Sequence, residues 1–184
     1  MKILAGTIAA AVLFAAPSAQ AAHWNVDVGH SKLGFTVLWA KQPFTASFKS
    51  WKANVDFDPA NVAAAKADVT IAIGSMTSGD ADTDASIAGG IGFDAGKFPT
   101  AHFVATKFTH KSGNDYVADG TLTLKGVTRP ISLPFTLTIN GRSAHMVGSA
   151  SVLWNHFGVG TGQWAAPDPV AWDVKVNIDL MAMQ

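Results

Sequence analysis

Residues 116–138 read YVADGTLTLKGVTRPISLPFTLT, and apolar and polar side chains alternate through most of this stretch. In its second half Ile131, Leu133 and Phe135 occupy every other position. Such alternation is typical of a strand with one buried and one solvated face. The connection over residues 126–130 is rich in turn-forming residues, so the stretch predicts a hairpin of two strands.

The same alternation recurs from residue 23 to the end of the chain. It is clearest in residues 170–180, where apolar side chains take every second position. Breaks at residues 29–31 and 49–50 predict bends of the kind that small barrels use to curve. The chain has no glutamate and contains 17 glycines, a composition that disfavours helix.

Two segments predict short helices. Residues 61–66 are alanine-rich and suit one helical turn, and residues 82–87 suit a short helix within the irregular segment 74–99. A loop of that length is typical of a lid or a binding element. The remaining segments make about eight strands, which fit either a closed barrel or a two-sheet sandwich. We favour an all-β, antiparallel eight-stranded barrel, because its interior is just wide enough for large side chains or one ligand.

The first 21 residues have the parts of an export signal. Lys2 supplies a positive charge, residues 3–16 are apolar, and residues 19–21 read Ala-Gln-Ala, a cleavage site. The apolar run is too short to span a bilayer comfortably. We therefore expect a cleaved signal peptide over residues 1–21 and one domain over residues 22–184. The chain has no cysteine, so this exported domain must fold without disulfides.

Composition and motifs argue against several classes of function. Lysine and arginine total 13, as do the acidic residues, and no basic patch for nucleic acid is evident. Residues 80–84 resemble the start of a calcium loop, but the glycine and glutamate that such a loop requires are missing. The six histidines share no metal-binding spacing, and no catalytic triad can be assembled. We therefore expect no metal, no nucleic acid and no enzyme activity.

Aromatic residues carry the remaining signal, with 6 tryptophans and 11 phenylalanines. They suit an ordinary barrel core, and they equally suit a cavity for an apolar ligand. The candidates for the wall and mouth of such a cavity are Phe35, Trp39, Phe48, Trp51, Phe93, Phe103, Leu122, Leu124, Phe135 and Trp154. Lys125 and Arg129, at the expected hairpin turn, are candidates for contact with an anionic head group, although a solvated turn explains them equally well.

Five motifs resemble the YceI-like family of polyisoprenoid-binding proteins, and together they cover essentially the whole chain after the leader. The motifs are Trp24-x-Val26-Asp27-x-x-His30-Ser31-x-Leu33-x-Phe35, Val55-Asp56-Phe57-Asp58-Pro59, Phe93-Asp94-x-x-Lys97-Phe98-Pro99-x-x-x-Phe103, Gly120-x-Leu122-Thr123-Leu124-Lys125-Gly126-Val127-Thr128-Arg129-Pro130-Ile131 and Phe157-Gly158-Val159. The resemblance implies a lipocalin-like antiparallel barrel with one or two short helices. It also implies a long isoprenoid or another long-chain lipid bound in the central cavity, with no cofactor required.

The resemblance further implies a location and partners. Members of the family are commonly exported to the periplasm, several are dimers, and some are linked to cytochrome b561-type membrane partners. We therefore expect a periplasmic carrier, store or sensor of lipid, with a homodimer and such a cytochrome as candidate assemblies. Two alternatives stay open. One is an accessory protein of respiratory redox or stress physiology that acts through a bound quinone-like lipid, and the other is a small outer-membrane barrel.

Overall fold

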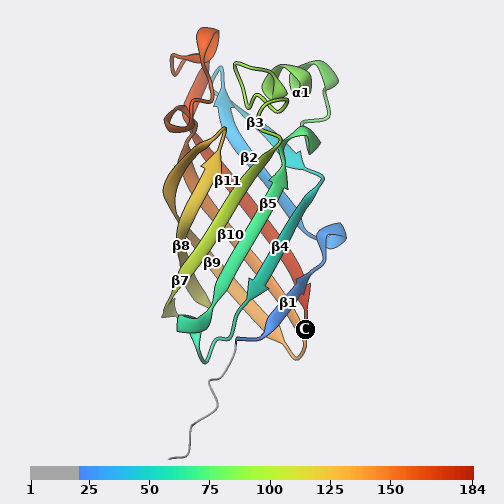
Figure 1. Ribbon diagram of the computed structural model, residues 1–184, viewed down its shortest axis with the longest axis vertical. Coiled ribbons are helices and arrows are strands. Elements are labelled where there is room, and N and C mark those ends of the chain that lie inside the picture. Colours follow the sequence, from blue (N-terminus) through green and yellow to red (C-terminus); the bar gives the residue numbers. More distant parts are fainter. Residues whose placement is uncertain (1–20) are drawn as a thin grey trace, which may run out of the picture.

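The computed structural model describes residues 21–184, which form the upright barrel of Figure 1. The signal peptide expected over residues 1–21 lies, except for its last residue, outside the described residues. Within them, eleven strand segments form one antiparallel sheet. The segments are β1 (His23–Val26), β2 (Lys32–Trp39), β3 (Gln42–Phe48), β4 (Trp51–Asp56), β5 (Lys66–Ala72), β6 (Met76–Thr77), β7 (Thr100–Ser112), β8 (Asp115–Leu124), β9 (Val127–Asn140), β10 (Ser143–Leu153) and β11 (Val170–Met183).

The sheet closes on itself into a ring of eight strands. The order around the ring is β1-β4-β5-β7-β8-β9-β10-β11, and β1 pairs with β11 to complete it. β1 and β2 both pair with β11, one after the other along its length. On their other side β4 pairs with β1, and β3 pairs with β2. β1 and β2 therefore act as one bent strand of the barrel, and so do β3 and β4. The predicted all-β, eight-stranded antiparallel barrel is confirmed, and the sandwich alternative is wrong because the sheet has no open edge along this ring.

The two bends predicted from the sequence are present. Between β1 and β2 the chain makes a 3-10 turn, η1 (Val28–His30), which Asp27 caps by accepting a hydrogen bond from the His30 backbone N–H at 3.2 Å. Between β3 and β4 the ladder breaks at Ser50, whose N–H donates to the hydroxyl of Ser75 at 3.0 Å. These breaks let long strands curve around a narrow interior.

Short helices occupy the two predicted places. The helical elements are η2 (Val62–Ala64), η3 (Ile73–Ser75), α1 (Ala81–Ala88), η4 (Trp154–Phe157) and η5 (Gly162–Trp164). η2 packs on the lower part of the barrel, while α1, together with η4 and η5, covers the upper end. Asp80 caps α1 by accepting from the Thr83 N–H at 2.8 Å, and Asp84 accepts from the N–H and the hydroxyl of Ser78 at 2.7 and 2.6 Å. The acidic run of residues 80–84 therefore fixes a helix in place.

The hairpin of residues 116–138 forms, but its turn is tighter than predicted. The ladder between β8 and β9 continues to its last pair, Leu124 with Val127. Only Lys125 and Gly126 remain in the turn, with positive φ angles of 50° and 77°, as a two-residue hairpin turn requires. The prediction of a turn extending to residue 130 is therefore wrong, and Arg129 lies within β9.

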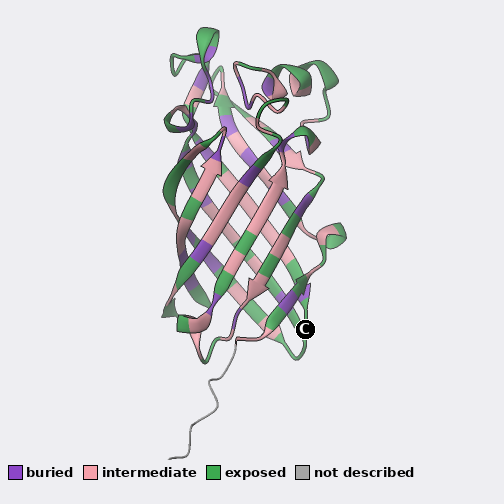
Figure 2. Ribbon diagram, viewed as in Figure 1, coloured by how far each residue is buried: buried purple, intermediate pink, exposed green. Residues whose placement is uncertain are grey.

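Buried residues, purple in Figure 2, occur along the barrel and fall into two clusters. The upper cluster lies beneath α1, η4 and η5, and its larger members are Phe35, Ile87, Phe93, Trp154, Phe157 and Trp164. The lower cluster extends from the start of β1 and the end of β11 up to Leu133 and Ala150, and its larger members are Trp24, Phe57, Tyr116, Leu133 and Phe135. Ile131 packs against both clusters.

Candidate ligand-binding cavity

An internal cavity of about 220 Å³ runs between the upper and lower clusters. Every residue that lines it is apolar or glycine. Its volume exceeds the ~150 Å³ of an engineered cavity that binds benzene, and it lies below the ~300 Å³ at which pockets for drug-sized ligands begin. The cavity therefore suits a slender apolar chain better than a bulky ligand.

Small side chains at inward positions create this space. The alanines that line the cavity are Ala53 on β4, Ala67 on β5, Ala101 on β7, Ala118 on β8, Ala144 and Ala150 on β10 and Ala182 on β11. Because alanine cannot fill the interior of the barrel, a gap remains beside the larger side chains of β9. Sequence reasoning missed these alanines because it followed the aromatics. The alternation that placed the aromatics inside would have identified the alanines too.

The structure places nine of the ten predicted wall residues on the cavity. The nine are Phe35, Phe48, Trp51, Phe93, Phe103, Leu122, Leu124, Phe135 and Trp154. Trp39 is not among the lining residues: its ring packs against Trp164 at 6.0 Å and against Phe44 at 5.8 Å. Trp39 therefore contributes to packing near the upper end, beyond the cavity.

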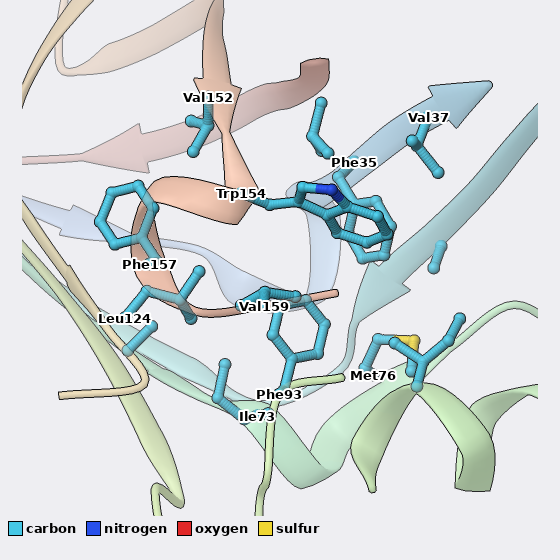
Figure 3. Close-up of a cluster of buried hydrophobic side chains, with 14 of the residues drawn as sticks. Phe35, Val37, Ile73, Met76, Phe93, Leu124, Val152, Trp154, Phe157 and Val159 are labelled. Carbon is cyan, nitrogen blue, oxygen red and sulfur yellow. The ribbon is translucent and has the colours of Figure 1, made fainter. Parts of the chain in front are cut away.

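Aromatic rings form the roof and the floor. At the floor Tyr116 stacks on Phe135 with ring centroids 5.5 Å apart, and Phe57 meets Tyr116 edge-on at 5.3 Å. At the roof Phe93 meets Phe35 edge-on at 6.1 Å. Figure 3 shows the roof, where Phe35 from β2, Val152 from β10, Trp154 and Phe157 from η4 and Phe93 from the segment after α1 converge.

Two buried polar atoms stand at the upper end of this apolar space. Nε1 of Trp154 and Oδ1 of Asn155 have no hydrogen-bond partner among the described residues. A buried polar group left without a partner costs about 1–3 kcal/mol. Trp154 also lines the cavity, so one of these two atoms belongs to a residue of the cavity wall.

Lys125 is held by the protein itself. Its Nζ donates to the carbonyls of Gly90 and Gly92, both at 2.8 Å, and so ties the β8–β9 turn to the loop after α1. Partial burial lowers the pKa of Lys125 because desolvation disfavours its charged form, while the charge of Asp94 opposes that shift. The side chain thus secures the roof of the cavity rather than standing free at its mouth.

Arg129 has a different setting. Cross-strand partners form a row from Ala53 through Val69, Phe103 and Leu122 to Arg129, and directly opposite residues share one face of a sheet. The first four members of the row line the cavity, so the Arg129 side chain starts on the inner face. Its Nε donates to the His156 carbonyl at 3.4 Å. Within the part of the chain that the structure describes, Arg129 forms no salt bridge.

The outer wall carries several of the histidines. His23, His102 and His145 each contact an aspartate on a neighbouring strand at 2.8 Å. Over residues 21–184 no group of three histidine or acidic side chains could hold a metal ion. No helix within the same residues is long and apolar enough to cross a membrane.

Comparison with known proteins places the chain in a family. A family model described as the YceI-like domain matches residues 24–182. The chain belongs to the YceI-like family. A UPF0312 protein of Photorhabdus laumondii is 35% identical to this YceI-like chain over 144 residues, which cover 77% of the chain and 74% of the relative. A UPF0312 protein of Shewanella oneidensis is 30% identical over 162 residues, which cover 86% of this chain and 80% of the relative.

Solved structures share the barrel of this YceI-like protein. BcnA of Burkholderia cenocepacia superposes with a TM-score of 0.84 at 33% identity, over 86% of this chain and all of that one (100%). A polyisoprenoid binding domain from Saccharophagus degradans has the same fold, with a TM-score of 0.69 at 14% identity. The match covers 89% of this chain and 99% of that domain. The family and the fold that the five motifs implied are confirmed.

Proposed function

We propose that this YceI-like protein binds a long-chain isoprenoid or a similar amphiphilic lipid in the barrel cavity, as a periplasmic carrier, store or sensor. The observation that carries the proposal is the wholly apolar cavity of about 220 Å³ between two packed ends. A neighbour with the same fold is described as a polyisoprenoid binding domain, which supports this class of ligand. The homodimer and the cytochrome b561-type partner remain predictions from the family resemblance.

The size of the cavity limits what chain burial contributes to affinity. If a cavity of ~150 Å³ holds the six carbons of benzene, one of 220 Å³ holds about nine. At ~0.8 kcal/mol for each buried methylene, nine carbons contribute about 7 kcal/mol. Association itself costs about 4–15 kcal/mol. Tight binding therefore requires a longer chain, an anchored head group, or both.

We assign ligand contact to the nine predicted residues that line the cavity and to the alanines between them. Trp39 is assigned to packing. At the upper end the unpaired N–H of Trp154 suits the oxygen of an alcohol, a phosphate or a carbonyl. A quinone-like lipid would satisfy the same donor, so the respiratory alternative shares the site and differs in the head group.

Native mass spectrometry of protein purified from its own host tests the proposal. We expect an adduct with the mass of a long-chain amphiphile, loss of that adduct on organic extraction, and rebinding of added farnesol. An extract that absorbs like a quinone would assign the protein to the respiratory alternative. The proposal fails if several preparations carry no lipid and the protein binds no added isoprenoid.

A further inference from the structure

A seam separates two long strands in the upper half of the barrel wall. β9 and β10 pair only from Asn140 with Ser143 to Phe135 with Gly148. Above that last pair, residues 127–134 of β9 do not pair with residues 149–153 of β10. On their other sides β9 stays paired with β8 and β10 with β11. The seam therefore lies between two strands that are each firmly held.

Two prolines explain why the ladder stops. The N–H of Leu137 donates to Asn114 on the β8 side of β9. Because successive backbone groups along a strand point to opposite neighbours, the nitrogens of Pro134 and Pro130 point toward β10. Proline has no N–H to donate, so β9 cannot extend the ladder at these positions. A central strand is otherwise a poor place for proline.

Gly148 marks the foot of the seam. A Cβ at Gly148 would lie 3.0 Å from the Pro134 carbonyl and 3.0 Å from Cβ of Phe135. The strands thus make their last close contact at a residue without a side chain. A depression on the outer wall reaches this point, since Pro134, Gly148 and Ser149 are among its lining residues.

The seam lies directly between the cavity and the outer surface. Ile131 and Leu133 on β9 and Ala150 and Val152 on β10 all line the cavity. At the upper end of the seam the chain turns into η4, where Arg129 reaches the His156 carbonyl at 3.4 Å, a long distance for an N–H···O bond. The unpaired buried atoms of Trp154 and Asn155 belong to the same turn.

The two ends of the barrel are poorer routes into the cavity. Opening the upper end would move the buried rings of Phe93, Phe157 and Trp164 toward water, and opening the lower end would expose Trp24 and Phe57. Exposure of large apolar side chains is unfavourable. Opening the seam breaks no strand pairing above Gly148, and beyond the long contact of Arg129 it disturbs the packing of smaller side chains, Leu133, Ala150 and Val152.

We propose that the β9–β10 seam is a lateral portal for a long-chain amphiphile, and that Arg129 binds its phosphate or carboxylate head group at the edge of that portal. The proposal rests on the proposed function of lipid binding. A chain longer than about nine carbons exceeds the cavity and must leave the barrel somewhere, and the seam lies beside an arginine. A guanidinium matches phosphate or carboxylate geometry with two parallel hydrogen bonds.

The portal is tested by blocking it. Because the chain has no cysteine, Ser151→Cys on β10 beside the seam can be labelled alone with a bulky maleimide. Ser143→Cys is the matched control, another exposed serine on the same strand within the paired part. Stopped-flow tryptophan fluorescence measures the association rate of farnesyl phosphate. We expect the label at residue 151 to slow association about tenfold or more, with little effect of the control label.

Failure of the portal and failure of lipid binding give different results. If both labelled variants take up farnesyl phosphate at the rate of the unlabelled protein, the portal is overturned while the proposed function stands. If the unlabelled protein binds neither farnesyl phosphate nor farnesol, the proposed function fails and the portal with it.

The head-group site is tested by comparing two ligands that share one chain. In Arg129→Gln we expect the dissociation constant for farnesyl phosphate to rise about tenfold, through loss of charge-assisted hydrogen bonds, and that for farnesol to stay unchanged. Arg142→Gln, at the lower end of the barrel where Arg142 contacts Gln184, should change neither. Equal weakening of both ligands in Arg129→Gln would overturn the assignment. Displacement of farnesyl phosphate by an equal concentration of inorganic phosphate would also overturn it, in favour of a free-phosphate site.

Discussion

Substitution of Ala53 by phenylalanine should fill the cavity and abolish ligand binding without unfolding the barrel. Ala53 lines the cavity from β4, beside Val69 on β5. A phenyl ring requires ~150 Å³, which is about two-thirds of the 220 Å³ present. The ring then displaces about six of the nine carbons that the cavity holds, worth about 5 kcal/mol at ~0.8 kcal/mol each. Because ~1.4 kcal/mol is a factor of ten, affinity should fall by three orders of magnitude or more.

The same change should leave the barrel at least as stable. Filling empty volume raises the free energy of unfolding by up to ~24 cal/mol per Å³, and strain from imperfect packing lowers it by about 1–3 kcal/mol. We expect the free energy of unfolding to stay constant or to rise by up to about 2 kcal/mol. Asn54→Phe is the matched control, since it adds the same ring to the outer face of the same strand.

Intrinsic tryptophan fluorescence during titration with farnesol provides the binding assay, because Trp24, Trp51 and Trp154 line the cavity. Urea denaturation of each variant provides the stability. The reasoning is refuted if Ala53→Phe is folded and binds farnesol as tightly as the unchanged protein. It is also refuted if Asn54→Phe loses binding to the same extent.

Four further predictions concern the floor of the cavity, Trp39, Asp84 and the location of the protein. Phe135→Ala removes a buried ring that stacks on its neighbours and should lower the free energy of unfolding by about 3–5 kcal/mol in urea denaturation; a loss below 1 kcal/mol would show that the floor is loosely packed. Trp39→Phe should leave farnesol affinity unchanged, since Trp39 packs on Trp164 outside the cavity lining; weaker binding would place Trp39 at the ligand. Hydrogen bonds from Ser78 lower the pKa of Asp84, so this carboxylate stabilises the fold above its unfolded pKa of ~3.9, and that contribution is lost as the pH falls through the lower folded value. Asp84→Asn should therefore lose less stability than the unchanged protein between about pH 5 and pH 2 in denaturation curves, and an identical loss would contradict the assignment. Osmotic shock of the native host should release the protein without detergent, whereas a requirement for detergent would favour the outer-membrane alternative.

Much of the fold follows from local pattern. The alternation of residues 170–180 predicts β11, and the breaks at residues 29–31 and 49–50 predict the bends that join β1 to β2 and β3 to β4. Each of these features depends on near neighbours in the chain, because a residue's face is set by period 2 and a bend by the loss of that period.

The turn of the opening hairpin shows where local pattern fails. Pro130 suggests that the turn extends past Arg129, because proline is common in turns and rare in central strands. In the barrel this proline is tolerated since its nitrogen points across the seam to a part of β10 that offers no pairing. The missing pairing depends on β9 and β10 together, so the sequence of one strand alone does not predict it.

The position of Trp39 shows a second limit. Alternation correctly places its side chain in the inward row of β2, but it does not say how far along the barrel the cavity extends. The length of the cavity depends on the alanines of β4, β5, β7, β8, β10 and β11 and on the two aromatic clusters that close it. Arg129 is in phase with Ile131 and Leu133 on the inner face of β9, and sequence reasoning missed this because it placed Arg129 in the turn.

The central claim is that the barrel interior holds the apolar chain of the ligand. A crystal structure with an isoprenoid alcohol that carries bromine at the tail end tests it most directly, because the anomalous signal of bromine locates the tail. We predict the bromine inside the barrel, in contact with Ala53, Phe103 or Leu122, which lie in one cross-strand row on the cavity wall. Bromine bound only on the outer surface, with the cavity unchanged, would contradict the account.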